Sequence, residues 1–329
     1  MTKQKKTLCI IGAAVLVPVL IIVLVVNVTL NKIKRFDGYE QSMTEEEYSA
    51  QSGADEAAAN YSVVAEDKIN WGEKLDIEMN GNSFNVLLIG TDLDEGGTSR
   101  SDSMIVCNVN LDAKKVTLIS FLRDCYVQIP DHKDNKLNAA YAFGGVELLD
   151  RTLEENFGVA VDANVLVDFK AFQKVIDALG GVEVYLFSDE CAYVNSGTKG
   201  KSYKEGYCLL DGEAALAYCR IRKLDSDFGR TERQRKVLTA LYNKFHTITL
   251  KEALDLIDKV FPLVTTDITN SEMVSYAVKL LPIIRECEIE PAHIPVDGTW
   301  ENANVRGMAV LLLDFDKNRA TLKEIIEGE

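Results

Sequence analysis

Short apolar runs alternate with segments of helical spacing in the C-terminal three-quarters of the chain, and this alternation limits the fold more than any other feature. The run FNVLLIGTD at residues 84–92 closes on a glycine and an aspartate, which is typical of a buried strand before a loop. Residues 103–111 and 115–124 predict two more strands, joined by a turn at DAK. Residues 138–158 have helical spacing and end on Gly158, a good helix stop.

The same alternation continues along the rest of the chain. Strand-like runs lie at residues 163–169 and 182–187, separated by a helical segment that ends in two glycines. Asp211 is the expected N-cap of a helix over residues 211–220. Further helices are expected over residues 230–246, 265–284 and 318–326, and residues 307–316 predict a strand at the edge of the same core. Strands that alternate with helices define an α/β sheet domain.

An uncharged apolar stretch at residues 8–30 precedes this domain. Its 23 residues are enough to cross a bilayer as a helix. A cleaved signal peptide is the alternative, but the run is long for one and lacks a clear small-residue cleavage site. Three basic side chains flank each end, so the positive-inside count is a tie. A short tail at residues 1–7 before a large C-terminal domain favours the tail inside and the domain outside.

The segment after the apolar stretch, residues 31–80, is predicted to be a polar, acidic stem. It contains few large aliphatic residues and is expected to bury little. The compact domain is then expected over residues 81–329. Of the seven cysteines, only Cys191 and Cys208 flank a polar loop in a way that suggests a disulfide, and two free thiols are an equal alternative. There is no CxxC and no pair of histidines at metal-ligand spacing, so a structural zinc site is not expected.

The distribution of charge is uneven. The chain has a formal net charge of −15, which argues against a nucleic-acid binder. Yet residues 219–236, CRIRKLDSDFGRTERQRK, hold seven basic residues against three acidic ones. Arg230 is expected in the first turn of a helix, sharing a face with Arg233 and Gln234. Cations there oppose the helix dipole unless an anion binds among them, so the segment predicts an oxyanion site.

Individual basic residues of this segment have simpler explanations. Arg220 and Arg222 lie near the end of the preceding helix, where positive charge is favourable in any case. Arg235 and Lys236 are expected on a solvated helix face. The prediction of an anion site therefore depends on the set as a whole.

Further charged residues lie at the predicted strand ends. Asp92 ends one strand, and RSDSM, with Arg100 and Asp102, begins the next. If these strands are neighbours, the two carboxylates meet at one sheet edge, where they could hold Mg²⁺ against a phosphate. Arg123 and Asp124 end a third strand, and ligands of open α/β sheets gather outside the carboxyl ends of strands. A local ion pair is the plainer alternative, and a solvated loop is the plainer alternative for Lys136, which precedes a predicted N-cap at Asn138.

Several catalytic motifs are missing. The sequence contains no P-loop, no GxGxxG after the first strand, no GxSxG and no HExxH. Its three histidines are isolated, so a histidine-based triad is not expected.

Taken in order, the motifs resemble a known family. The series GTD, RSDSMIV, SFLRD, NKLNAAYAFGG, VDFKAFQKVIDALGGVEV, LDGEAALAYCRIRK and DFGRTERQ is similar to the LytR-CpsA-Psr family of bacterial cell-envelope proteins. The resemblance implies an α-β-α sandwich with a central mixed sheet, preceded by one transmembrane helix, and an extracytoplasmic domain on the cell membrane. It also implies a phosphotransferase that moves a glycopolymer from an undecaprenyl-pyrophosphate carrier to the 6-hydroxyl of N-acetylmuramic acid in peptidoglycan, releasing undecaprenyl phosphate. The polymer itself, such as wall teichoic acid or capsule polysaccharide, is left open.

The resemblance also assigns roles to residues. The acids associated with Mg²⁺ (or Mn²⁺) are Asp92 and Asp102. The pyrophosphate-binding and catalytic positions are Arg100, Asp102, Arg123, Asp124, Arg220, Arg222 and Arg230, with Lys136, Asp227 and Gln234 as substrate-binding positions. Helical spacing adds Arg233 to the substrate-binding set. Either Asp102 or Asp124 is a possible general base. Two residues depart from the family pattern: Leu122 replaces a proline, which predicts a less rigid loop, and Thr91 replaces a commoner serine.

Two other functions fit the same residues. One is a lipid-pyrophosphate binder or envelope regulator without activity, and the other is a pyrophosphatase that uses water as the acceptor. Intact acids and arginines favour the transferase over the inactive binder.

Overall fold

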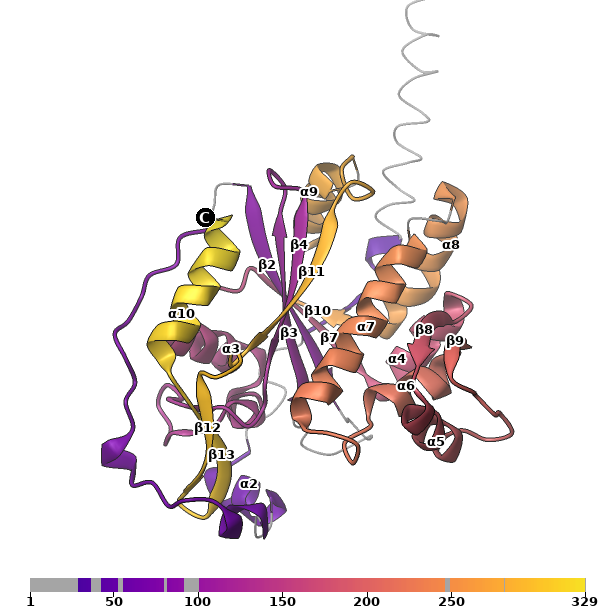
Figure 1. The fold of residues 1–329 in the computed structure, drawn as a ribbon. Coiled ribbons are helices and arrows are strands. Elements are labelled where there is room, and N and C mark those ends of the chain that lie inside the picture. The colour runs from indigo at the N-terminus through magenta and orange to yellow at the C-terminus, as the bar shows by residue number, and fades with distance from the viewer. Residues whose placement is uncertain are drawn as a thin grey trace, which may run out of the picture.

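The protein folds around a seven-stranded mixed sheet (Figure 1). The structure is a computed structural model that describes residues 29–36, 43–52, 56–79, 82–91, 101–245, 249–280 and 282–328. In spatial order the strands of the sheet are β1 Lys34–Arg35, β10 Thr265–Thr266, β7 Ala163–Asp168, β2 Ser83–Thr91, β3 Ser101–Asn110, β4 Lys115–Phe121 and β11 Glu288–Ile294. This confirms the predicted mixed sheet and the three predicted strands β2, β3 and β4.

Strand direction places several strand ends at one edge of the sheet. β2 is parallel to β7 and antiparallel to β3, and β3 is antiparallel to β4, which in turn is parallel to β11. The carboxyl ends of β2, β4, β7 and β11 therefore share an edge with the start of β3. Thr91 pairs with Ser101 at this edge, so the predicted adjacency of the first two strands is confirmed.

Both faces of the sheet are covered. Alternate side chains of β3 point to opposite faces, so that Met104 joins the largest core cluster and Ile105 joins a second cluster. The first face packs against α3 Leu137–Phe157 and α10 Phe315–Lys323, which runs on as a π-helical turn, η4 Glu324–Gly328. On the other face, the second cluster includes side chains of α7 Asp227–Phe245 and α9 Asn270–Leu280 (Figure 1).

A smaller lobe lies beside the sheet. It consists of α4 Phe169–Ala178, α5 Ser188–Gly197, α6 Gly212–Cys219 and the hairpin of β8 Val182–Leu186 and β9 Gly206–Leu210, which share a core of their own with α7. The side chain of Asp211 caps α6 by accepting a hydrogen bond from Ala214 N, as predicted. Helix α8 Leu250–Val260 and the turn η3 Phe261–Leu263 follow α7.

Several details differ from the sequence prediction. The predicted strand near the C-terminus, β13 Met308–Leu313, pairs with β12 Trp300–Val305 in a separate ribbon and not with the central sheet, although it contributes to the main core. The helix after β4 begins at Leu137, so Asn138 lies inside it and is not the N-cap. Its two glycines, Gly144 and Gly145, leave helical geometry and kink the helix, while Gly158 ends it with a positive φ of 71°.

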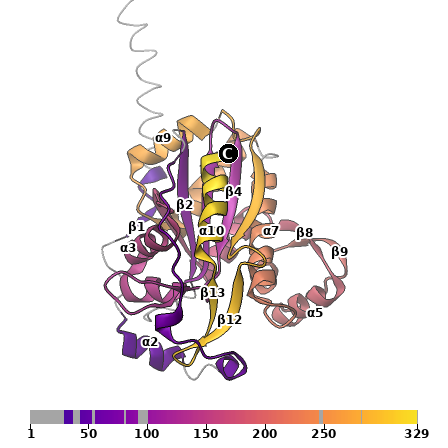
Figure 2. The ribbon, with the colours of Figure 1, turned by 60° about the vertical axis from the view of Figure 1, so that its left-hand side comes forward.

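The prediction that residues 31–80 bury little is wrong. Met43 and Tyr48, beside and on α2 Glu45–Ser52, enter the main core, and β1 joins the sheet edge. Residues 56–79, with the short turns η1 Glu56–Asn60 and η2 Glu66–Lys68, run along the β12–β13 ribbon and α10 (Figure 2). There the buried side chain of Arg319 donates hydrogen bonds to the carbonyl oxygens of Trp71 and Glu73. This segment is therefore part of the domain.

The predicted membrane anchor at residues 8–30 lies almost wholly outside the described residues. Within the described ranges, no helix has the length and apolar character needed to cross a membrane.

Candidate active site

An amphipathic cavity lies between the sheet and the helices that follow β7. Its volume is about 520 Å³, within the range of small-molecule sites. Most of its wall is apolar, formed by side chains of β2, β3 and β7 on one side and of α4, α6 and α7 on the other: Leu88, Ile105, Val165, Val167, Phe172, Leu216, Leu238 and Leu241. Only one end is charged, and there Asp102, Arg220, Arg222 and Arg230 reach the wall together with Ser103 and Gln234.

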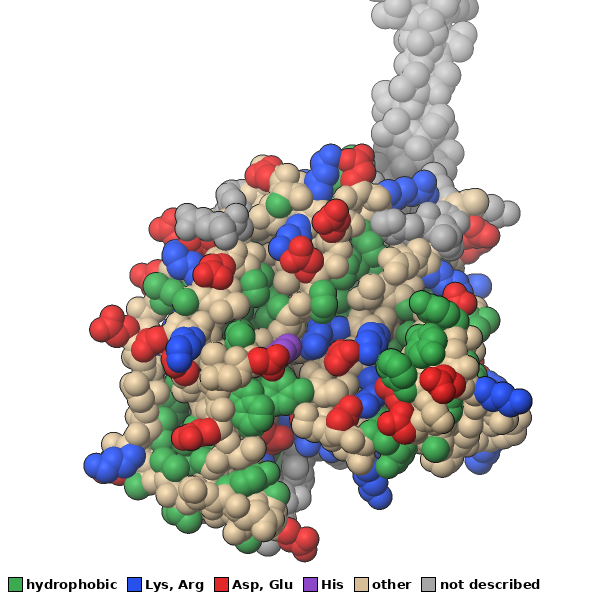
Figure 3. All heavy atoms as spheres, in the orientation of Figure 1, with side chains coloured by type: hydrophobic (Ala, Val, Ile, Leu, Met, Phe, Trp, Pro, Cys, Tyr) green, Lys and Arg blue, Asp and Glu red, His purple; other side chains and the backbone are tan. Residues whose placement is uncertain are grey.

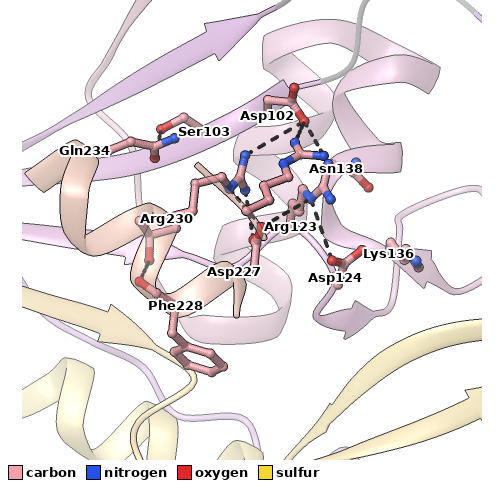
Figure 4. A network of polar contacts seen from close by, with 12 residues as sticks. Asp102, Ser103, Arg123, Asp124, Lys136, Asn138, Asp227, Phe228, Arg230 and Gln234 are labelled. Atoms are coloured by element: carbon pink, nitrogen blue, oxygen red, sulfur yellow. Dashed lines mark hydrogen bonds and ion pairs between the residues drawn. The ribbon is translucent and has the colours of Figure 1, made fainter. Parts of the chain in front are cut away.

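At this charged end, the mouth of the cavity, one carboxylate is surrounded by three guanidinium groups (Figure 4). Asp102, at the start of β3, accepts a hydrogen bond of 2.8 Å from Arg123 Nη1. The same oxygen, Oδ1, lies 3.2 Å from Arg222 Nη2 and 4.0 Å from Arg230 Nη1. The predicted convergence of Asp102 with the arginines of the basic segment is confirmed by this geometry.

Asp227 and Asp124 complete the mouth. Asp227, in the first turn of α7, accepts a hydrogen bond of 2.8 Å from Arg230 Nη2 and lies 3.8 Å from Arg123 Nε. Asp124 lies 3.6 Å from Arg123 Nε, and its other oxygen lies 3.1 Å from Lys136 Nζ. The first turn of α7 thus contains an acid and a cation three residues apart, both directed toward the strand ends.

The mouth has more positive than negative charge. Five basic side chains, Arg123, Lys136, Arg220, Arg222 and Arg230, meet three acidic ones, Asp102, Asp124 and Asp227. Arg220 lies over the Phe169 ring, 4.7 Å from its centroid, and is exposed. Gln234, one turn after Arg230, accepts a hydrogen bond of 2.9 Å from Ser103 Oγ. A surplus of guanidinium groups at a half-buried site favours a bound anion.

The pKa values reflect this crowding. Burial alone would raise the pKa of Asp102, but Arg123, Arg222 and Arg230 outweigh it and hold that pKa below its usual range. Burial and the neighbouring guanidinium groups of Arg123 and Arg230 lower the pKa of Arg222. Asp102 is therefore ionised at neutral pH, and Arg222 is a cation held among cations.

The structure does not bring every predicted residue to the cavity. Arg233 points away from it: Nε donates to Glu190 Oε1 at 2.8 Å and Nη2 to Asp225 Oδ2 at 2.6 Å. This pairing within the lobe contradicts the expectation that Arg233 shares a ligand-binding face with Arg230 and Gln234. Asp92 and Arg100 lie outside the described residues.

The residue that departs from the family's proline pattern is held firmly. The backbone N–H of Leu122 donates a 2.9 Å hydrogen bond to Ile294 O on β11, which a proline could not make. Its side chain is fully buried in the main core. The loop before Arg123 is therefore tied to its neighbour, contrary to the predicted loss of rigidity.

Of the two acids expected to bind a divalent cation, Asp102 lies within the described residues and Asp92 does not. The described residues include no group of three or more His, Cys, Asp or Glu side chains placed to bind a metal ion. The hydrogen bonds and ion pairs of Asp102 with Arg123, Arg222 and Arg230 run through its Oδ1. A carboxylate beside clustered guanidinium groups would fit Mg²⁺, which is usually bound through one or two carboxylates together with phosphate oxygens of a substrate.

Cys191 and Cys208 are free thiols in the structure, as are the other four cysteines of the described residues. Cys191 lies in the core of the lobe, and burial raises the pKa of its thiol. The suggested disulfide is therefore absent.

An apolar cavity closed by a cationic mouth defines a protein suited to an amphiphile with an anionic headgroup. The chain belongs to the LytR_cpsA_psr family, which it matches over residues 47–324. It is 31% identical over 258 residues to "Regulatory protein MsrR" of Staphylococcus aureus strain COL, covering 76% of each chain.

Two further matches are to TagT. The chain is 41% identical over 180 residues, 53% of its length and 56% of the relative's, to "Polyisoprenyl-teichoic acid--peptidoglycan teichoic acid transferase TagT" of Bacillus subtilis strain 168. A solved structure of the family protein YwtF (TagT) with bound octaprenyl pyrophosphate lipid is similar at a TM-score of 0.59 and 28% identity, over 78% of this chain and 93% of the other.

Proposed function

We propose that this protein is a phosphotransferase that moves a glycopolymer from a polyprenyl-pyrophosphate carrier to peptidoglycan. The observation that carries the proposal is the joining of an apolar cavity of about 520 Å³ to a mouth with surplus guanidinium groups. A polyprenyl tail is uncharged and flexible, and a pyrophosphate is a compact anion, so the two halves of such a donor match the two halves of the site. The names of the TagT relative and of its lipid-bound structure support the same donor class.

The finer substrates follow from the family resemblance. The carrier is undecaprenyl pyrophosphate, and the acceptor is the 6-hydroxyl of N-acetylmuramic acid. The apolar stretch at residues 8–30 anchors the chain in the cell membrane, with the domain outside the cytoplasm. This location gives the cavity access to a lipid-linked donor.

In the reaction, the acceptor hydroxyl oxygen attacks the phosphorus that carries the glycopolymer. The bond from that phosphorus to the bridging oxygen breaks, and undecaprenyl phosphate leaves with the electron pair. A phosphodiester joins polymer and peptidoglycan, and the hydroxyl proton passes to a base. Arg123, Arg222 and Arg230 spread the negative charge of the leaving phosphate, which is the main demand of phosphoryl transfer.

The choice of base follows from the contacts of the two acids. Asp102 is unsuited because its pKa is lowered and its Oδ1 is held by arginines. Among the described residues, the Asp124 carboxylate forms ion pairs with Lys136 and Arg123 only. We therefore assign Asp124 as the base. Lys136 then serves to orient the Asp124 carboxylate.

Mg²⁺ belongs to the proposal through Asp102 Oδ2, with Asp92 as the second acid expected from the sequence. When bound, the ion supplies positive charge beside the pyrophosphate. The three guanidinium groups around Oδ1 fix the orientation of the Asp102 carboxylate, which directs Oδ2 to the ion.

The test is product analysis with the full-length protein in detergent. The protein is incubated with Mg²⁺, a polyprenyl-pyrophosphate-linked sugar and peptidoglycan oligomers, alongside Arg123→Ala and the control Lys223→Ala, which changes an exposed cation next to the mouth. We expect polyprenyl monophosphate together with sugar-modified peptidoglycan, lost in Arg123→Ala and kept in the control. Monophosphate without modified peptidoglycan would indicate a pyrophosphatase, and lipid binding without turnover would indicate an inactive binder.

A further inference from the structure

A groove separate from the amphipathic cavity of the active site, here called the lipid cavity, lies on the opposite side of α7. It is open, with a volume of about 1010 Å³, and runs between the β8–β9 hairpin, α7 and the start of β11. Gln234 faces the lipid cavity, while the next residue, Arg235, faces this groove. Helix α7 is therefore a shared wall between the two.

The outer face of the hairpin is unusually apolar. One face of β8 packs Val182, Val184 and Leu186 into the core of the lobe. The other face is solvated, and such a face normally carries polar residues. Here Tyr207 is 77% exposed, Phe187, just after β8, is 51% exposed and Tyr185 is 40% exposed (Figure 3, hydrophobic side chains over β8 and β9).

The three rings form a connected platform. Tyr185 pairs with Tyr207 across the hairpin, with centroids 5.3 Å apart and an interplanar angle of 85°. Tyr185 and Phe187 lie 5.2 Å apart at 66°. The faces of such rings carry negative partial charge and attract the C–H groups of a sugar ring as well as other apolar surfaces. A platform of tyrosines beside an open groove suits a ligand with both apolar and hydroxyl-bearing faces.

A buried cation completes the groove. Arg235 is only 6% exposed, although its position predicted a solvated face. Its Nε and Nη1 atoms have no hydrogen-bond partner among the described residues. Two buried guanidinium nitrogens without hydrogen-bond partners are costly, and an anion from a ligand would supply the missing acceptors.

The remaining charges of the groove nearly balance. Lys236 pairs with Glu232 at 2.7 Å, and Lys244 donates to the carbonyl oxygen of Gly181 at 2.8 Å. Glu183 adds a negative charge to the wall. A polymer with a phosphate in every repeat would meet too few available cations here, whereas a mostly uncharged glycan with widely spaced carboxylates would meet one.

We infer that this groove binds the acceptor, a peptidoglycan strand, with sugar rings on the tyrosine platform and a carboxylate at Arg235. The inference rests on the proposed function for the identity of the strand. It places the lipid tail and the strand on opposite sides of α7, and the two substrates meet at the mouth, beside the first turn of that helix. Neither Arg235 nor the aromatic residues have a role in the donor site.

The test measures binding and not turnover, so its failure is separable from failure of the proposed function. Full-length protein in detergent is titrated with peptide-free peptidoglycan strands, whose lactyl groups carry carboxylates, and with polyglycerol phosphate. Tyr207→Ala should weaken strand binding roughly two- to tenfold through lost stacking. Arg235→Gln should weaken it roughly tenfold or more through the lost charge-assisted hydrogen bond. Val278→Ala, which changes another exposed apolar side chain on α9, is the matched control and should bind as the wild type.

Esterified strands sharpen the assignment of the carboxylate. Esterification should weaken binding to the wild type as much as Arg235→Gln does, and should have no further effect on that variant. Octaprenyl pyrophosphate affinity, measured on each protein, reports whether the variant is folded. Unchanged strand binding in folded Tyr207→Ala and Arg235→Gln, or tighter binding of polyglycerol phosphate than of the strands, would overturn the inference.

Discussion

Arg230 and Arg233 lie three residues apart on α7, and both are buried, yet their surroundings differ in kind. Arg233 donates hydrogen bonds to the carboxylates of Glu190 and Asp225 and to the backbone carbonyl of Ile221. Its positive charge is therefore neutralised within the lobe. Arg230 shares Asp227 and Asp102 with other cations at the cavity mouth. Its Nε lies 2.8 Å from Asp227 Oδ1 without the alignment of a hydrogen bond. An arginine whose charge is matched by its own carboxylate partners, such as Arg233, has a structural role. An arginine that shares its carboxylates with other cations, such as Arg230, is suited to binding an anionic ligand.

The largest expected effect is the loss of folding stability when Arg233, the arginine with balanced charge, is replaced. Arg233→Ala leaves Glu190 buried and unpaired, and breaking a buried pair in this way costs about 3–5 kcal/mol. Thermal denaturation of the full-length protein should show a marked fall in Tm, with less loss in Arg233→Lys. A Tm within about 1 °C of the wild type would show that this pair does not hold the lobe together.

Replacing an arginine of the cavity mouth should have the opposite effect, lowering the transfer rate and not the stability. Arg222→Ala should lower the transfer rate by about 10²-fold, because one charge-stabilising donor is lost. Its Tm should be little changed, since the Arg222 side chain is 46% exposed and its attraction to Asp102 is opposed by repulsion from Arg123 and Arg230. Lys223→Ala is the matched control, because it removes an adjacent exposed cation that does not line the cavity. A fall in Tm with an unchanged rate would contradict the comparison.

Changes in the apolar half of the cavity should weaken binding of the lipid tail and leave recognition of the pyrophosphate headgroup unchanged. Val167→Phe adds bulk to the cavity wall and should weaken octaprenyl pyrophosphate binding roughly tenfold by removing buried CH₂ contacts. Farnesyl pyrophosphate, with a shorter tail, should lose less. Val63→Phe, at a highly exposed position, is the control. Equal losses for both lipids would argue that the tail lies elsewhere.

The smallest effect concerns pH. The folded-state pKa of Asp102 is lowered, so its stabilising contribution is present above the unfolded value of about 3.9 and is lost as pH falls through the lower folded value. The Tm difference between wild type and Asp102→Asn should therefore be constant from pH 7 to about pH 5 and shrink below about pH 4. Thermal denaturation across this range checks it, and a difference that shrinks near neutral pH would refute the lowered pKa.

The fold was predictable where one physical signal dominated. Apolar alternation predicted β2, β3 and β4, and Gly158 and Asp211 correctly marked a helix end and a helix start. β11 was missed because EIEPAHI mixes charge, proline and apolar residues, and it forms an edge strand through parallel pairing with β4. The role of residues 31–80 was missed because a few side chains, such as Tyr48 and Met43, attach a mainly polar segment to a distant core.

The site was predictable at the level of residue types but not of orientation. Helical spacing correctly placed Arg230 and Gln234 on one face, and the strand ends placed Asp102 near Arg123. The spacing could not show that Arg233 turns to Glu190 and Asp225, because both partners come from tertiary packing of α5 and the loop before α7. Nor could it show that Arg235 lines a groove together with the β8–β9 hairpin, since that arrangement depends on where the lobe packs.

The central claim is that the unbalanced charge at the mouth is there to bind a pyrophosphate. Calorimetric titration of the full-length protein with octaprenyl pyrophosphate and octaprenyl monophosphate tests it most directly, because the two lipids differ only in the headgroup. We expect the pyrophosphate to bind at least about tenfold more tightly, with this preference lost in Arg123→Ala and kept in Lys223→Ala. Equal affinities for the two lipids, or a preference that survives in Arg123→Ala, would contradict the account.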